Sequence, residues 1–316
     1  MTDLHELWRT EIPGDADHAF LADQATSSVY VGDGWSVPFS ALRLHRLDLT
    51  TGRQIVAIRT RHQQVKSLLI SRGNLYAATD SRLFELDPTT LEVRRQWDRG
   101  LVAYATQLVA DGDWLVMANW LRPSVGIFDP EAGRTHRVNV GKQPIILFHD
   151  GRAKTISGFD GGLATLDSGR ARLIDRTHTP PIAHAAAGAD IWAVAAGPPR
   201  GGERHQPVRT RAGSNVLLRL TGEPTETRLA GDVSYIACDD QRQVVWCRSA
   251  ELGGELWAAA QHTGKVVGPY TAPRGFLIQH VSPAAGIALA TAVARRDVIG
   301  GTVRSATATC VCLALP

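Results

Sequence analysis

The stretch "LFELDPTTLEV", Leu83 to Val93, reads as a short apolar strand, a turn and a second strand. The turn is built on Asp87-Pro88-Thr89-Thr90, where proline presets the backbone and the aspartate side chain accepts hydrogen bonds from the backbone that follows. The alternation of apolar and polar residues after the turn predicts a half-buried strand. Such a hairpin decides the fold only if it recurs along the chain.

The hairpin does recur. Its turn residue reappears as Asp48, Asp129 and Asp167, and Thr221 and Gln261 continue the series. The spacing is about 40 residues, which is typical of a β-propeller with one four-stranded blade per repeat. The wider gap before Thr221 marks an insertion. No copy shows the 3.6-residue periodicity of helical repeats.

The last repeat, from Gly275 onward, supplies only three strands and lacks its outermost one. The segment from Leu4 to Ile12 has the alternation of the missing strand. We therefore predict a seven-bladed β-propeller of four-stranded antiparallel blades, whose ring is closed by the N-terminal strand completing the last blade. Residues 1–316 form one domain in this prediction, with blades at 18–62, 63–102, 103–141, 142–178, 179–231, 232–273 and 274–316, the last completed by 4–12.

Two segments, "LDLTTGRQI" from Leu47 and "AAQHTGKVV" from Ala259, have the pattern D-x-x-T-G-x-x-x or close to it. They resemble the strand-turn-strand core of quinoprotein-type (PQQ-like) and YVTN-type propeller repeats. The resemblance covers nearly the whole chain and implies a propeller fold. It concerns only the residues that build the blades, so it implies no catalytic residue.

Composition indicates a folded globular protein, with 44% hydrophobic and 21% charged residues. The net charge of +3 is too small to indicate nucleic acid, so we expect no nucleic-acid partner. Arginine supplies nearly all the positive charge, since the chain has only four lysines: Lys66, Lys142, Lys154 and Lys265. This bias fits a GC-rich bacterial genome; it also fits arginines that bind planar anions.

The N-terminus lacks the pattern of a signal peptide, and no apolar run is long enough to span a membrane. We therefore expect a cytoplasmic protein with no membrane partner. The cysteines, Cys238, Cys247, Cys310 and Cys312, show no C-x-x-C spacing. Free thiols are the expectation in that compartment, and a zinc site would need more ligands at better spacing.

The longer insertions, at 32–41, 119–126, 197–214 and 294–306, fall between the second and third strands of blades. In a propeller these loops emerge on one face. We call their aromatic and basic residues the loop face: Trp35, Phe39, Trp120, Arg122, Arg200, Arg204, His205, Arg209, Arg211, Arg295 and Arg296. This composition is typical of interaction hot spots and suits a carboxylate, a phosphate or an acidic peptide. In the alternative interpretation the tryptophans cap the blades and the arginines are solvated.

The innermost strands begin near the same face and look into the channel. Their first residues form a second candidate site, the channel mouth: His18, Lys66, Gln107, Ile145 or Ile146, His184, Tyr235, Gln279 and His280. His18, His184 and His280 are candidate catalytic or metal-binding residues, because imidazole serves both purposes near neutral pH. The alternative is that a water-filled channel needs a polar lining anyway.

Two functions follow. The first is an interaction module without a cofactor, whose loop face binds a protein or acidic peptide partner. The alternative is a stand-alone enzyme, similar to the propeller lyases and lactonases, that acts on a small molecule at the channel mouth with or without a divalent metal. A structural subunit of a larger assembly is a third interpretation. Fold alone does not separate them.

Overall fold

The structure is a computed structural model of the 316-residue chain. It describes residues 2–14, 18–34, 37, 41–60, 63–98, 105, 107–118, 122–141, 144–149, 152–157, 162–167, 170–176, 181–187, 190–195, 214–221, 225–249, 255–292 and 307–316. The fold is all-β, and its strands form two compact units. The terminal unit comprises Asp3–Leu108 and Ala272–Pro316; the central unit comprises Met1–Thr2 and Val109–Thr271.

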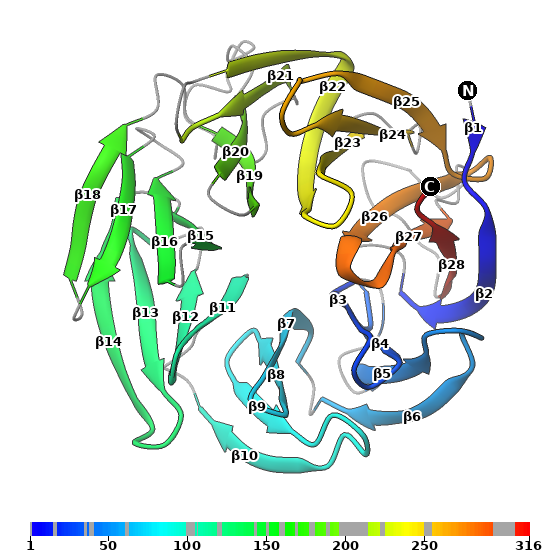
Figure 1. The fold of residues 1–316 in the computed structure, drawn as a ribbon. Coiled ribbons are helices and arrows are strands. Elements are labelled where there is room, and N and C mark those ends of the chain that lie inside the picture. Colours follow the sequence, from blue (N-terminus) through cyan, green and yellow to red (C-terminus); the bar gives the residue numbers. More distant parts are fainter. Residues whose placement is uncertain are drawn as a thin grey trace, which may run out of the picture. The chain divides into compact units, whose positions relative to one another are not determined.

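The terminal unit contains three four-stranded antiparallel sheets (Figure 1). The first, in sheet order, is β3 (Phe20–Asp23), β4 (Ser28–Gly32), β5 (Arg43–Asp48) and β6 (Gln54–Arg59). The second is β7 (Val65–Ser71), β8 (Asn74–Thr79), β9 (Leu83–Leu86) and β10 (Val93–Trp97). The third is β26 (Phe276–Ser282), β27 (Ile287–Ala292), β28 (Thr307–Ala314) and β2 (Glu6–Pro13), with the 3-10 turn η4 (Pro283–Ala285) before β27.

The central unit contains two four-stranded sheets and one of eight strands. The smaller sheets are β11 (Gln107–Asp111), β12 (Trp114–Ala118), β13 (Ser124–Asp129) and β14 (Arg134–Asn139), then β15 (Pro144–His149), β16 (Arg152–Ser157), β17 (Gly162–Asp167) and β18 (Arg170–Arg176). The eight-stranded sheet is β19 (Pro181–Ala187), β20 (Asp190–Ala195), β21 (Ser214–Arg219), β22 (Thr225–Asp239), β23 (Val244–Ser249), β24 (Glu255–Ala260), β25 (Val266–Thr271) and β1 (Thr2–Asp3).

The prediction of seven separate blades is wrong, because the described residues form six sheets. The predicted fifth and sixth blades meet at 231/232, and this boundary requires the chain to turn between two strands. Instead β22 runs through this point for 15 residues and pairs with β21 on one side and β23 on the other. Gly231 does not adopt a positive φ, so nothing breaks the strand there.

The prediction that hydrogen bonds close the ring is also wrong. Among the described strands, no hydrogen-bonded ladder joins the six sheets into a ring. The N-terminal strand β2 pairs antiparallel with β28, from Glu6 opposite Leu313 to Pro13 opposite Thr307. This pairing completes one four-stranded sheet and covers the edge of β28, which would otherwise expose unpaired backbone groups.

Apolar side chains fill the space between neighbouring sheets within each unit. In the terminal unit one cluster includes Tyr30 and Leu44 from the β3–β6 sheet with Leu75 and Phe84 from the β7–β10 sheet. A second cluster joins β2, β27 and β28 to β4 and β5. In the central unit Trp192 and Trp257 lie in one cluster that spans both halves of the eight-stranded sheet. Burial of this apolar surface is the main force that stabilises the sheets against one another.

The repeated aspartate has the structural role that the turn sequence predicts. Oδ1 of Asp48, Asp87 and Asp129 each accepts two backbone N–H groups of its own turn, at 2.7–3.0 Å. For Asp87 the donors are Thr89 and Thr90, and these bonds hold the pKa of the carboxyl below its usual range. The Asp48 carboxyl has a lowered pKa for the same reason, with the Thr51 hydroxyl as the largest contributor.

The turn of the opening stretch also fastens one sheet to the next. The Tyr30 hydroxyl on β4 donates to the carbonyl oxygen of Pro88 at 2.7 Å, and the Arg46 guanidinium on β5 donates to that of Thr89. Tyr30 is fully buried, and burial raises the pKa of its phenol. The bond from Tyr30 supplies a donor to the carbonyl oxygen of the buried Pro88, which would otherwise lack one.

Candidate functional site

Two of the three candidate catalytic histidines lie in one aromatic cluster of the terminal unit. Phe20, at the start of β3, has its ring centroid 5.8 Å from that of His18 and 6.5 Å from that of His280 on β26. Nε2 of His18 is 3.0 Å from the carbonyl oxygen of Pro13, which is a hydrogen bond only if Nε2 carries the proton. In that tautomer the ring lone pair of His18 is on Nδ1.

The side chain of the third histidine, His184, lies outside the described residues, although its backbone belongs to β19 in the central unit. The predicted meeting of three imidazoles therefore stays a prediction. In the described part of the chain, no group of three or more His, Cys, Asp or Glu side chains is arranged to hold a metal ion.

Lys66, another channel-mouth residue, sits in a polar cluster at the beginning of β7. Its Nζ donates to Gln64 Oε1 at 2.5 Å and lies 3.5 Å from Oδ1 of Asp80. Both members of the Lys66–Asp80 pair are more than 70% buried at the side chain, at 18% and 26% exposure. The charge of Lys66 is thus partly balanced by the Asp80 carboxylate.

In the central unit the channel-mouth residue Tyr235 contacts a largely buried arginine. The guanidinium carbon of Arg248 lies 5.2 Å from the Tyr235 ring centroid, and Nη2 donates to the Ser234 hydroxyl at 3.2 Å. Burial lowers the pKa of Arg248, the direction expected for a desolvated cation. Gln107 and Gln279 lie on β11 and β26, and Ile145 and Ile146 on β15 are buried.

The loop face falls almost entirely outside the described residues. Trp35, Phe39, Trp120, Arg200, Arg204, His205, Arg209, Arg211, Arg295 and Arg296 lie there. The exception is Arg122, just before β13. It is exposed, and in the part of the chain that the structure describes it makes no hydrogen bond or ion pair.

A buried polar network at the foot of the first insertion was missed from the sequence. Nε2 of His45 is 2.6 Å from Oδ1 of Asp33, and its Nδ1 is 2.8 Å from Oε1 of Gln54. Oδ2 of Asp33 accepts the backbone N–H of Arg43 at 2.8 Å. His45 and Asp33 are 3% and 1% exposed, so each needs its partners. In the sequence, Asp33 is one residue of the insertion at 32–41, and no local pattern indicates its pairing with His45.

The four cysteines are free thiols. Burial raises the pKa of Cys312 to about 12 and raises the pKa values of Cys238, Cys247 and Cys310 still further. The thiolate is the reactive form of cysteine, and a raised pKa keeps the thiol protonated. These four side chains therefore act as small apolar core residues. No helix in the described residues is long and apolar enough to cross a bilayer.

A family model described as outer membrane protein assembly factor BamB, of PQQ-like type, matches residues 1–139. No curated protein matches the chain in sequence. The WD40 domain of Neurospora crassa Pan2 is similar in structure, with 9% identity, 98% of this chain and 95% of that chain covered, and a TM-score of 0.69. The β-propeller domain of Cps50 (Swd1) from Myceliophteria thermophila is similar at 10% identity, 96% and 98% coverage, and a TM-score of 0.67.

BamB from Moraxella catarrhalis is also similar, at 15% identity with 71% of this chain and 67% of that chain covered, but its TM-score of 0.46 adds no support. The resemblance to YVTN-type repeats stays a prediction. The WD40 and Cps50 structures support the fold over nearly the whole chain, which is an all-β β-propeller; the match to the PQQ-like family model covers residues 1–139.

Proposed function

We propose that this protein is a cytoplasmic interaction module, which binds a protein or an acidic peptide through its loop face. The observation that carries the proposal is the contrast between the repeats and Arg122. Repeat side chains such as Asp87, Tyr30 and Arg46 are occupied in holding turns and sheets together. Arg122, in an insertion, is exposed and makes no such bond in the described part of the chain.

The comparisons agree with this role at a general level. The matching family model is described as an assembly factor, and the similar Pan2 structure is a WD40 domain. Propellers present loops from a rigid scaffold, which limits the conformational entropy lost on binding. An arginine-rich loop face would bind carboxylates through the guanidinium fork.

Charge reversal tests the proposal. The double variant Arg204→Glu/Arg209→Glu should lose a partner that wild type retains in a pull-down from its host, with no change in melting temperature. Arg228→Glu is the control, since Arg228 is 77% exposed at the side chain and lies on β22 rather than in an insertion. Retention of the partner by the double variant would contradict the proposal.

One observation favours the enzyme alternative. His18 and His280 come from distant parts of the sequence and contact the same ring, Phe20. Imidazoles placed in this way can transfer protons to and from a bound small molecule. Under this alternative, purified protein hydrolyses a member of a lactone or ester panel, and His280→Ala abolishes the turnover. An inactive wild type that carries no bound metal or metabolite would count against it.

A further inference from the structure

One sheet edge of the terminal unit lacks the charges that protect comparable edges. The strands β2, β6, β10, β14 and β18 each form the edge of a four-stranded sheet that is farthest from its first strand (Figure 1). An edge strand presents unpaired backbone N–H and C=O groups, and proteins commonly blunt such an edge with charged side chains. Charged residues within an edge strand therefore keep other strands from pairing with it.

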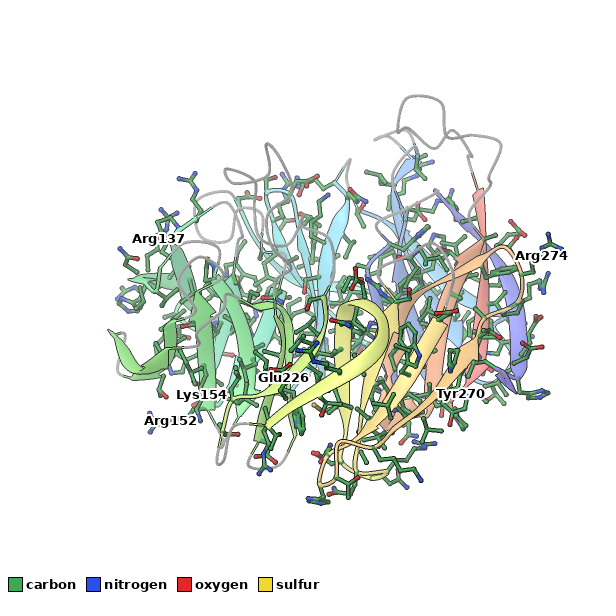
Figure 2. All side chains as sticks on the ribbon, turned by 90° about the horizontal axis from the view of Figure 1, so that it is seen from above. Arg137, Arg152, Lys154, Glu226, Tyr270 and Arg274 are labelled. Carbon is green, nitrogen blue, oxygen red and sulfur yellow. The ribbon has the colours of Figure 1, made fainter. Side chains whose placement is uncertain are left out.

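The strand β6 is the exception among these five. Between its first and last residues, Gln54 and Arg59, it contains only Ile-Val-Ala-Ile. Within the described part of the chain, residues 55–58 make no backbone hydrogen bond outside the ladder with β5. A charged residue lies inside each of the other four strands: Arg9 on β2, Arg94 on β10, Arg172 on β18 and Arg137 on β14, the last exposed and labelled in Figure 2.

The strand β6 also exposes an apolar side chain at this edge. In its ladder with β5, Gln54 lies opposite Leu47 and Val56 lies opposite Arg46. Ile55 is therefore an extra residue without a partner on β5, and a bulge of this kind redirects the side chain of the extra residue. Ile55 is 45% exposed. The edge thus offers both unpaired backbone groups and an accessible apolar side chain.

The sequence of β6 is complementary to itself in an antiparallel pair. A two-fold axis between the third and fourth residues of the strand places Ile55 of one copy opposite Ile58 of the other. Apolar β-branched residues that lie opposite each other stabilise a strand pair. The same axis places Gln54 opposite Arg59 of the second copy, so no like charges meet across the pair.

The charges beside the first residues of β6 do not oppose this pairing. The contact between Trp8 and Gly52 places the start of β2 beside the turn before β6. Glu6 and Arg9 on β2 bind each other, and Arg53 in the turn lies close enough to lower the pKa of the Asp48 carboxyl. The carboxylates at this end of β6 therefore balance its arginines.

The cation that a second copy would bring to this end is Arg59. It is exposed, and within the described residues it makes no hydrogen bond or ion pair. Across the pair it meets the amide of Gln54 in a setting without excess positive charge. The Gln54 Oε1 atom is 2.8 Å from Nδ1 of His45 and has a second lone pair for the guanidinium.

We propose that the β6 edge binds the β6 edge of a second copy of this chain, forming a two-fold symmetric dimer. The inference goes beyond the proposed function, which concerns the loop face. Each copy has one unprotected edge among the five compared, so a two-fold pairing uses it completely and stops at two copies. A dimer carries two loop faces and would bind a repeated partner with avidity.

The test is sedimentation velocity of the full chain at several concentrations. Wild type should show a reversible monomer–dimer equilibrium with a Kd of about 10–100 µM, because a single strand pair makes a small interface. Ile55→Lys should weaken the dimer by at least about tenfold, since lysine on an edge strand opposes pairing. The control is Val93→Lys, because Val93 is 39% exposed on β10, outside the proposed interface. It should leave the dimer unchanged.

A second measurement needs no variant. Hydrogen exchange of wild type is compared by mass spectrometry at about 5 µM and about 500 µM, on either side of the expected Kd. The peptide that contains β6 should exchange more slowly at the higher concentration, whereas the peptide that contains β10 should not change. This measurement keeps the inference testable even if Ile55→Lys fails to fold.

Three results would overturn the inference. They are a wild type that stays monomeric at about 500 µM, equal weakening by Ile55→Lys and Val93→Lys, and exchange of the β6 peptide that does not depend on concentration. A host protein that binds monomeric wild type but not Ile55→Lys would assign the edge to another chain and overturn it as well. The proposed function fails separately, because Arg204→Glu/Arg209→Glu changes the loop face and should leave the dimer intact.

Discussion

The indole of Trp8 on β2 lies directly against Gly52 in the turn between β5 and β6. A Cβ atom at Gly52 would be 2.4 Å from Cε3 of Trp8, and the indole Nε1 donates to the carbonyl oxygen of Leu49 at 2.8 Å. The strand β2 is thus held twice, by its ladder with β28 and by this contact with a second sheet. Glycine is required at position 52 for space as well as for its φ of +68°.

Gly52→Ala should therefore destabilise the protein more than its backbone conformation alone explains. The matched control is Gly73→Ala, since Gly73 has a φ of +70° but no atom within 4 Å of its added Cβ. Gly73→Ala should cost about 1–2 kcal/mol from the left-handed backbone. Gly52→Ala should cost a further 1–3 kcal/mol, roughly, from the clash with Trp8. Urea unfolding measures both, and equal losses would show that the Trp8 contact is not tight.

Tyr30→Phe tests the bond between neighbouring sheets. The change removes the hydroxyl that donates to Pro88 and leaves that carbonyl without its donor, so the free energy of unfolding should fall by about 1–2 kcal/mol. Tyr76→Phe is the control, because the Tyr76 hydroxyl is also buried but lies 3.5 Å from its acceptor Glu85. Its loss should be clearly smaller. A Tyr30→Phe protein as stable as wild type would contradict the role of this bond.

Asp87 should make stability depend on acid pH. Its pKa is lowered in the fold, so its contribution is present above the unfolded pKa and is lost as the pH falls through the folded pKa. Melting temperatures measured downward from about pH 5 should therefore fall less steeply for Asp87→Asn than for wild type. Glu92→Gln, in the same hairpin, is the control and should retain the wild-type slope. An unchanged slope in Asp87→Asn would refute the assignment.

The thiols should be inert in the folded protein. Cys247, Cys310 and Cys312 are fully buried, and burial raises the pKa of all four thiols above the range in which thiolate forms near neutral pH. A disulfide-exchange reagent such as DTNB at pH 8 should react slowly with native protein and with all four cysteines in denaturant. Fast reaction of a native cysteine would show that it is exposed or activated.

The repeat could be read from the sequence because its signals are local. Proline, threonine and aspartate in "LDPTT" determine a turn within a few residues, and Asp87 caps that turn as expected. The blade count was wrong for the opposite reason. Whether β22 turns or continues at Gly231 depends on its pairing with both β21 and β23, which lie on either side of it in the sheet.

The contacts between sheets could not be predicted from local pattern. Tyr30 and Pro88 are 58 positions apart, and Trp8 and Leu49 are 41 apart. The grouping of His18 with His280 around Phe20 likewise depends on which inner strands are neighbours.

Native mass spectrometry of protein purified gently from its own host, with metal analysis of the same sample, tests the proposed function most directly. An interaction module predicts a stoichiometric protein partner on wild type that is absent from the Arg204→Glu/Arg209→Glu variant. A sample that carries no protein partner but a bound metal ion or small molecule would contradict it and would direct attention to His18, His184 and His280.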